Sequence, residues 1–257
     1  MGSMGRKTHD KGMNVNIVHS GSSGNTASID DFLIIDVGWP EVPKGEHVLL
    51  THNHTDHTKC LDKVGGLPTY CTPETADRLA QKWPFLAFSS LTPGDVKVLC
   101  SNEFQYTIKI IPLRHDAPCV GFEIQRCARS EYAEPQTILW LTDFNEIVDE
   151  KYIIRALRDK RFDHIYIECN NTLSTGDMMD LFFTDEVPRD EFHRRKSYQN
   201  HCNVEYLIGL FTRAGYTPDR RYELPVTLLH KSSYYYLNHS ERIVELCKLA
   251  NVINPLI

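Results

Sequence analysis

The segment Thr51-His52-Asn53-His54-Thr55-Asp56-His57 decides how this sequence is expected to fold. His52 follows directly on the apolar run 47–51, so the segment is expected on a loop that leaves a strand. Residues two apart point to the same side of an extended segment, which places His52 and His54 to bind one ion. The turn that follows presents a carboxylate and an imidazole, Asp56 and His57, to a second ion. The spacing therefore predicts two metal sites built from one loop.

Short apolar segments separated by turn residues surround this loop. They predict strands at 14–20, 32–38, 47–52, 105–113, 120–126, 136–143, 164–169 and 223–230. Helices are predicted at 73–82, 149–159, 203–214 and 238–250, with Thr72 capping the first and the pair Asn238 and Glu241 capping the last. Two β-rich halves that each end in helices indicate an α/β fold with a layered sheet core and helices outside.

The composition is that of a folded protein with a substantial core. Of 257 residues, 41% are hydrophobic and 24% charged, which excludes disordered, collagen-like and coiled-coil classes. Residues 1–12 are small, polar and basic and are expected to be a leader outside the fold, so 13–257 is predicted to be a single domain. No stretch approaches the roughly 20 apolar residues of a membrane helix, and no secretory signal is evident, so a cytoplasmic location is expected.

The charge balance bears on the kind of substrate. A formal net charge of −6 gives no general attraction to a long nucleic acid, so a polymer substrate would need a local basic patch. Eight cysteines are scattered along the chain without CxxC spacing, which argues against a structural zinc site. The charge favours a small substrate.

The HxHxDH motif at 52–57, the turn GSSGN at 21–25 and the segment IIDVG at 34–38 together resemble the metallo-β-lactamase superfamily of dinuclear metallohydrolases. The resemblance extends from Met13 to about Ser240. It implies an αββα sandwich, in which two mixed β-sheets pack together and carry helices on their outer faces.

The resemblance also implies the remaining ligands, each at the end of an apolar strand. The first metal is assigned to His52, His54 and His115, the second to Asp56, His57 and His230, and Asp143 bridges the two. Asp36 is expected to hold ligand histidines by hydrogen bonding. His201 is the alternative to His230 as last ligand. The expected cofactors are two divalent ions, zinc first and manganese second.

Segments outside the motif resemble one branch of the superfamily. The stretches 20–25, 115–121, 167–170 and 200–203 are similar to WalJ/YycJ-type nucleases and to phage anti-Pycsar cyclic-nucleotide phosphodiesterases. A β-lactamase would carry a cysteine ligand where this chain has Asp143. The resemblance implies hydrolysis of 3′,5′-cyclic nucleotides to nucleoside monophosphates in a bacterial or infected-host cytoplasm, in the service of phage immune evasion. A DNA or RNA exonuclease, a glyoxalase II-like thioester hydrolase and a non-catalytic nucleotide-sequestering protein remain alternatives.

Further residues are expected to serve catalysis and binding. Asp56 and His201 are the expected catalytic residues; His201 is expected to begin a helix and to donate to a phosphate oxygen or protonate the leaving group. Arg194 and Arg195 are candidates for binding phosphate, and Tyr234 for stacking on a base. The resemblance implies a homodimer, with the segment 171–189 as its candidate contact.

Overall fold

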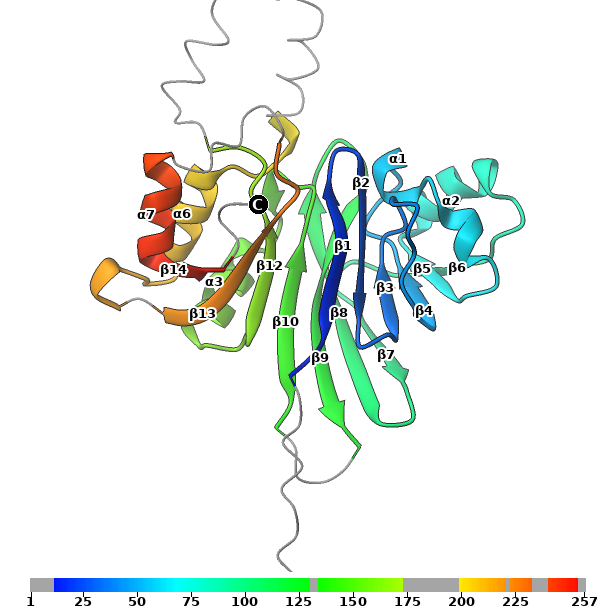
Figure 1. Ribbon diagram of the computed structural model, residues 1–257, viewed down its shortest axis with the longest axis horizontal. Coiled ribbons are helices and arrows are strands. Elements are labelled where there is room, and N and C mark those ends of the chain that lie inside the picture. The colour runs from blue at the N-terminus through cyan, green and yellow to red at the C-terminus, as the bar shows by residue number, and fades with distance from the viewer. Residues whose placement is uncertain (1–11, 130–133, 173–198, 221, 233–239, 254–257) are drawn as a thin grey trace, which may run out of the picture.

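Two mixed β-sheets pack face to face at the centre of the protein (Figure 1). The computed structural model describes residues 12–129, 134–172, 199–220, 222–232 and 240–253. The six-stranded sheet has the order β1-β2-β3-β4-β5-β6, and the eight-stranded sheet has the order β11-β8-β9-β10-β12-β13-β14 with β7 paired to β8. The strands of the first sheet are β1 (Val15–Gly21), β2 (Gly24–Ile29), β3 (Leu33–Ile35), β4 (His47–Leu49), β5 (Thr69–Cys71) and β6 (Phe88–Ser90). Those of the second are β7 (Val96–Cys100), β8 (Phe104–Arg114), β9 (Cys119–Ala128), β10 (Gln136–Leu141), β11 (Glu146–Ile147), β12 (His164–Glu168), β13 (Tyr222–Leu229) and β14 (Ala250–Val252).

Each sheet changes from antiparallel to parallel pairing part-way across. In the first sheet β1, β2 and β3 are antiparallel neighbours, while β3 to β6 run parallel. In the second, β8, β9 and β10 are antiparallel, and β10, β12, β13 and β14 run parallel. The parallel strands β3 and β12 are almost wholly buried, because both faces of the sheet are covered; this explains why they read as apolar runs.

Helices cover the outer face of each sheet (Figure 1). Helix α2 (Pro73–Lys82) and the 3-10 turn η1 (Leu61–Val64) pack on the six-stranded sheet, and α3 (Glu150–Arg158), α6 (Val204–Arg213) and α7 (Glu241–Leu249) pack on the eight-stranded sheet. A short helix α1 (Thr55–Thr58) follows β4, and η2 (Pro218–Arg220) precedes β13. The predicted arrangement of two packed sheets with outer helices is confirmed.

The helix termini agree with the sequence in one case and correct it in another. Thr72 caps α2 by accepting a hydrogen bond from the Thr75 backbone N–H, as predicted. The predicted cap of α7 is wrong: Ser240 is the N-cap and accepts from Ile243 N–H, so Glu241 is the first helical residue, and Asn238 lies outside the described residues. The serine hydroxyl stands directly before the first helical turn, where it serves one of the backbone amides that have no partner within the helix.

The core consists of three apolar layers. One lies between the sheets, where Leu33 and Leu49 meet Ile110 and Phe122. The second joins the eight-stranded sheet to α3, α6 and α7, and the third joins the six-stranded sheet to α2 and η1. Among the described residues, no helix is long and apolar enough to cross a membrane. This framework brings the ends of β4, β8, β10, β12 and β13 together at one edge, where the polar side chains collect.

Candidate metal centre

The histidine loop is tied to the neighbouring turn by backbone hydrogen bonds. The amide of Val37 donates to the His57 carbonyl at 2.8 Å, and the amide of Cys60 donates to the Val37 carbonyl at 2.9 Å. Gly38 fits between these segments because it has no side chain: a Cβ there would stand 1.5 Å from the Asp56 carbonyl oxygen. The loop geometry therefore depends on this glycine.

The first cluster contains His52, His54 and His115, whose ligand nitrogens lie within 4.8 Å of one another. Nδ1 of His115 donates to the carbonyl of Asn200 at 2.9 Å, and Nδ1 of His52 is 3.0 Å from the Thr51 hydroxyl. These contacts fix the rings and leave the Nε2 atoms of His52 and His115 facing the cluster. His52 comes from the loop after β4 and His115 from the end of β8, so both sheets contribute.

The second cluster contains Asp56, His57, Asp143 and His230. Oδ2 of Asp143 is 3.3 Å from Nε2 of His57 and 3.5 Å from Nε2 of His230, which is also 3.5 Å from Oδ2 of Asp56. The same Asp143 oxygen lies 3.9 Å from Nε2 of His52 in the first cluster. Asp143 thus lies between the two clusters.

The donor set fits a pair of divalent cations. Nε2 of His52 and Nε2 of His230 are buried and make no hydrogen bond in the described part of the chain, an unfavourable state that a bound cation would relieve. Imidazole and carboxylate together suit zinc, manganese or iron. The clusters are therefore suited to divalent metals.

The electrostatics differ between the clusters: they favour a neutral imidazole at His52 in the first cluster and an ionised carboxylate at Asp143 in the second. Burial, reinforced by His57, holds the pKa of His52 well below its ordinary value. Burial opposes ionisation of Asp143, but His230 and His57 outweigh it and keep the pKa of that carboxyl well below its ordinary value. Burial also lowers the pKa of His230, yet Asp143, Asp56 and Glu168 raise it to about 10. The carboxylates of the second cluster therefore favour positive charge beside them, which a bound cation would supply in place of the histidine protons.

Asp36 contacts residues that support both clusters. Its carboxylate accepts from Nδ1 of His57 at 2.7 Å and from the Thr51 hydroxyl and amide at 2.9 Å. Asp36, Asp143 and His230 also have left-handed backbones, with φ of 57°, 53° and 49°. Such conformations are costly for non-glycine residues and persist where the surrounding structure fixes them, commonly at functional sites.

Glu168, at the end of β12, is a site residue that the sequence analysis missed. Its buried carboxylate lies 2.6 Å from Nδ1 of His201 and 3.2 Å from Nδ1 of His230, and it accepts from the Phe144 amide at 2.8 Å. With Asp143, His201 and His230 it forms a third group of potential ligands. A glutamate ending an otherwise apolar strand, IYIE, was the available signal.

His201 lies between the clusters, but it does not begin a helix. Asn203 is the N-cap of α6, two residues after His201, and accepts from the Tyr206 amide. The expectation that a helix N-terminus serves His201 is wrong, because the free amides of that helix are served by Asn203. The His201 ring instead stacks on the His230 ring, with the ring centroids 4.9 Å apart, and meets the His115 ring edge-on, with the centroids 5.1 Å apart.

Asn25 is a second missed residue. Its side-chain amide lies 2.9 Å from Nε2 of His57 and 3.2 Å from Oδ2 of Asp56, while its oxygen accepts from the Gly21 amide. In the sequence the GSSGN turn contributes to the family resemblance but indicates no role for Asn25 at the site. The turn brings Asn25 against the second cluster.

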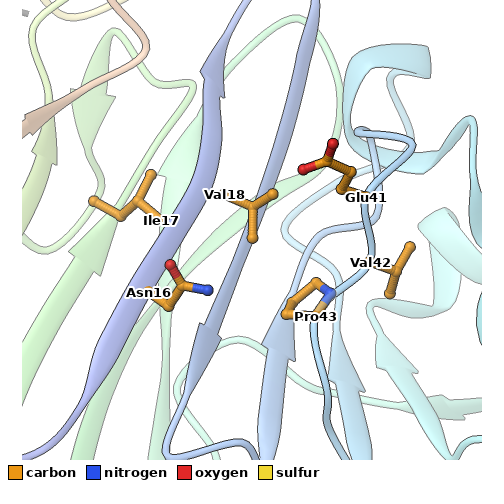
Figure 2. Close-up of a pocket in the computed structure, with 6 residues that line it drawn as sticks. All are labelled: Asn16, Ile17, Val18, Glu41, Val42 and Pro43. Carbon is orange, nitrogen blue, oxygen red and sulfur yellow. The ribbon is translucent and has the colours of Figure 1, made fainter.

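Some expected site residues cannot be placed. Arg194, Arg195 and Tyr234 lie outside the described residues, as does the proposed dimer contact 171–189 apart from Asn171 and Thr172, which are buried. A shallow hollow lies elsewhere, between β1 and the segment 41–43 (Figure 2). Its lining includes Asn16, Val18 and Glu41 but none of the clustered side chains, so it plays no part in the candidate centre.

Comparison with known families assigns the chain to a superfamily. The sequence model described as "Beta-lactamase superfamily domain" matches residues 36–182, more than half of the chain. The chain belongs to the metallo-β-lactamase superfamily. The match begins at Asp36 and includes the histidine loop, His115 and Asp143, whereas His201 and His230 lie beyond it. The comparison with curated proteins found no match.

Several solved structures resemble the fold of this chain. The metallo-beta-lactamase fold protein YhfI from Bacillus subtilis is 17% identical with a TM-score of 0.60, covering 93% of this chain and 95% of that one. Unliganded yeast PDE1 is 12% identical with a TM-score of 0.61, covering 93% and 96%. A diphosphatase from the PhnP family is 12% identical with a TM-score of 0.54, covering 85% of each chain. At these identities the similarity establishes the fold, which is that of metallo-hydrolases.

Proposed function

We propose that this metallo-β-lactamase superfamily member is a dinuclear metal-dependent phosphodiesterase that hydrolyses 3′,5′-cyclic nucleotides to nucleoside monophosphates. The observation that carries the proposal is the position of Asp143 between two ligand clusters, 3.3 Å from His57 and 3.9 Å from His52. His52, His54 and His115 would hold one ion and Asp56, His57 and His230 the other. When bound, two such ions activate a water molecule and neutralise charge on a phosphate.

The protein's own residues supply orientation. Asp36 and Glu168 accept hydrogen bonds from the Nδ1 atoms of His57 and His230, so both rings present Nε2 to the centre. Thr51 does the same for His52. Because these supporting groups are buried, the ligand rings are held in place before a substrate arrives.

His201 is the proposed hydrogen-bond partner of the substrate. Its Nδ1 lies against Glu168, which leaves Nε2 for a phosphate oxygen or for the leaving oxygen. The ring contacts both His115 and His230, so a group bound between the clusters would lie beside it. Asp56 is the proposed catalytic carboxylate, and its Oδ2 lies 3.5 Å from Nε2 of His230.

Two observations support a small phosphate ester. The net charge of −6 disfavours a long polyanion, and one structural relative is named as a diphosphatase. Zinc is the proposed resident ion and manganese the alternative, since the donor set accepts both. The resemblance to phage anti-Pycsar phosphodiesterases and the homodimer remain part of the proposal.

The test is a side-by-side assay of metal-loaded protein. Cyclic mononucleotides, labelled single- and double-stranded DNA and RNA, and a thioester are each incubated with wild type, with chelator-treated protein and with Asp143→Asn. We expect turnover of a 3′,5′-cyclic nucleotide that chelation abolishes, that added zinc or manganese restores, and that Asp143→Asn lacks. Turnover of polymer alone would favour the exonuclease, and turnover of the thioester alone would favour the glyoxalase type. Intact nucleotide recovered from a tight complex would favour sequestration.

A further inference from the structure

Asp116 lies against the first cluster, although neither the motif nor the clusters described above include it. It follows His115 in the loop between β8 and β9, and about a third of its side chain is exposed. Its Oδ1 is 3.2 Å from Nε2 of His115 and 3.3 Å from Nε2 of His54. The two imidazoles approach each other as well, with Nε2 of His115 3.3 Å from Nδ1 of His54.

If both imidazoles are neutral, they have too few N–H groups to place a hydrogen in each of these three contacts. Nδ1 of His115 already donates to the Asn200 carbonyl, so Nε2 of the neutral ring carries a lone pair, and that lone pair faces the Asp116 carboxylate. A neutral His54 has a single N–H, which can point to His115 or to Asp116 but not to both. At least two of the three contacts are then between acceptors. A cation bound by Nδ1 of His54, Nε2 of His115 and Oδ1 of Asp116 removes this conflict, because it occupies the two imidazole lone pairs and leaves the Nε2–H of His54 to face Asp116.

The spacing also agrees with shared coordination. Two ligand atoms bound about 2.0–2.2 Å from one ion lie roughly 3–3.5 Å apart, which is the range of the contacts that Nε2 of His115 makes with Nδ1 of His54 and with Oδ1 of Asp116. We infer that Asp116 is a further ligand of the first metal ion, in addition to His52, His54 and His115. With Asp143 nearby, this site then offers three imidazoles and two carboxylates.

The additional carboxylate has a consequence for metal choice. A site of three histidines alone suits four-coordinate zinc, whereas extra oxygen ligands and a higher coordination number suit manganese. Asp116 is therefore expected to raise the affinity of the first site for manganese more than its affinity for zinc. This inference rests on the proposed dinuclear centre and assigns one more residue to it.

The experiment measures metal binding without reference to turnover. Wild type, Asp116→Asn and Asp116→Glu are stripped of metal and titrated with Mn²⁺ by electron paramagnetic resonance and with Zn²⁺ by competition against a chromophoric chelator. The Co²⁺-loaded forms are compared by visible absorption, which strengthens when the coordination number falls to four. Asp62→Asn is the matched control, because it removes the same charge from an exposed residue of η1.

We expect Asp116→Asn to bind Mn²⁺ at one site at least about tenfold more weakly, with a smaller loss for Zn²⁺ and a stronger cobalt spectrum. Asp116→Glu should recover part of the Mn²⁺ affinity, and Asp62→Asn should match wild type. Identical titrations and spectra for Asp116→Asn and wild type would overturn the inference and leave the dinuclear proposal intact; an imidazolium–carboxylate ion pair would give this result. Wild-type protein that binds fewer than two ions would overturn the dinuclear proposal itself.

Discussion

Oδ2 of Asp36 lies 2.7 Å from Nδ1 of His57, and both side chains are buried. The same carboxylate also accepts from the Thr51 amide and hydroxyl, so it receives donors from three groups and contributes none. This arrangement sets the tautomer of His57 and, through the Thr51 hydroxyl, the orientation of His52. One carboxylate therefore influences ligands in both clusters.

Asp36→Asn should weaken metal binding while preserving shape. The introduced NH₂ group must face either His57 Nδ1–H or the Thr51 amide, so one donor meets another donor. We expect metal affinity to fall about 10–100-fold, measured by competition with a chromophoric chelator. Asp31→Asn is the control, because Asp31 is exposed and has the left-handed backbone, φ 51°, that asparagine tolerates. Equal affinities in Asp36→Asn and Asp31→Asn would contradict the role given to Asp36.

Glu168→Gln tests the support behind His201 and His230. The glutamate accepts from both rings and from the amides of Phe144 and Cys202, so a glutamine NH₂ must again oppose a donor. We expect a loss of about 1–3 kcal/mol in the free energy of unfolding of the metal-free protein, measured by urea denaturation. Turnover of the loaded protein should also fall, because neither ring keeps its orientation. Unchanged stability and turnover would show that Glu168 does not hold these histidines.

Asp143→Asn addresses the centre of the proposal. Asparagine keeps the size of the side chain but removes the negative charge that two nearby dications require. We expect elemental analysis to show loss of at least one of the two ions, with nearly all turnover lost. Circular dichroism should match wild type, because Asp143 lies after β10 and outside the three apolar layers. Retention of both ions and of most activity would refute the bridging assignment.

Local spacing explains how much of this fold and site the sequence could predict. The histidine loop is seven residues long, and its HxHxDH pattern is visible without knowledge of the fold. Strands such as β8 and β12 are long or apolar enough to be recognised, and α2 carries its cap and proline in sequence. The family resemblance that rests on the histidine loop implies the superfamily fold, which is confirmed.

The remainder depends on tertiary contacts that leave no local pattern. Strands β5, β6, β11 and β14 have only two or three residues, and pairing with neighbours rather than propensity makes them strands. Asn25, Asp116 and Glu168 reach the clusters because three separate strands or turns end at one edge, and a lone polar residue after a strand has many other uses. Such residues become visible only when the two sheets are packed.

Gly38→Ala should disturb the second cluster through the backbone. The new methyl group would stand 1.5 Å from the Asp56 carbonyl oxygen and 2.8 Å from the Asn25 amide nitrogen, so the loop carrying Asp56 and His57 must move. We expect weaker binding of one ion and a lower melting temperature by differential scanning calorimetry. Gly65→Ala is the control, since its nearest neighbour, the Asp62 carbonyl oxygen, is 3.5 Å away. Wild-type metal content in Gly38→Ala would mean that the loop tolerates the shift.

His164 gives the fold a pH dependence apart from the clusters. It begins β12, at the opposite end from Glu168, where its ring stacks on Tyr166 and its Nε2 lies 2.8 Å from the Thr227 hydroxyl. Burial lowers the pKa of His164 from 6.5 to about 4. Between pH 6.5 and 4, His164 is therefore protonated in the unfolded chain but neutral in the folded protein. The free energy of unfolding falls as the pH drops through this window, and this residue does not change it above the window.

His164→Gln removes this titration. We expect wild type to lose about 1–2 kcal/mol more than the variant between pH 7 and pH 4, roughly half of what the full shift would give because part of the ring remains in solvent. Urea denaturation of both proteins in the presence of chelator isolates the effect, since the clustered histidines titrate equally in each. Parallel stability curves for the two proteins over this range would show that His164 is protonated in the fold at its ordinary pKa.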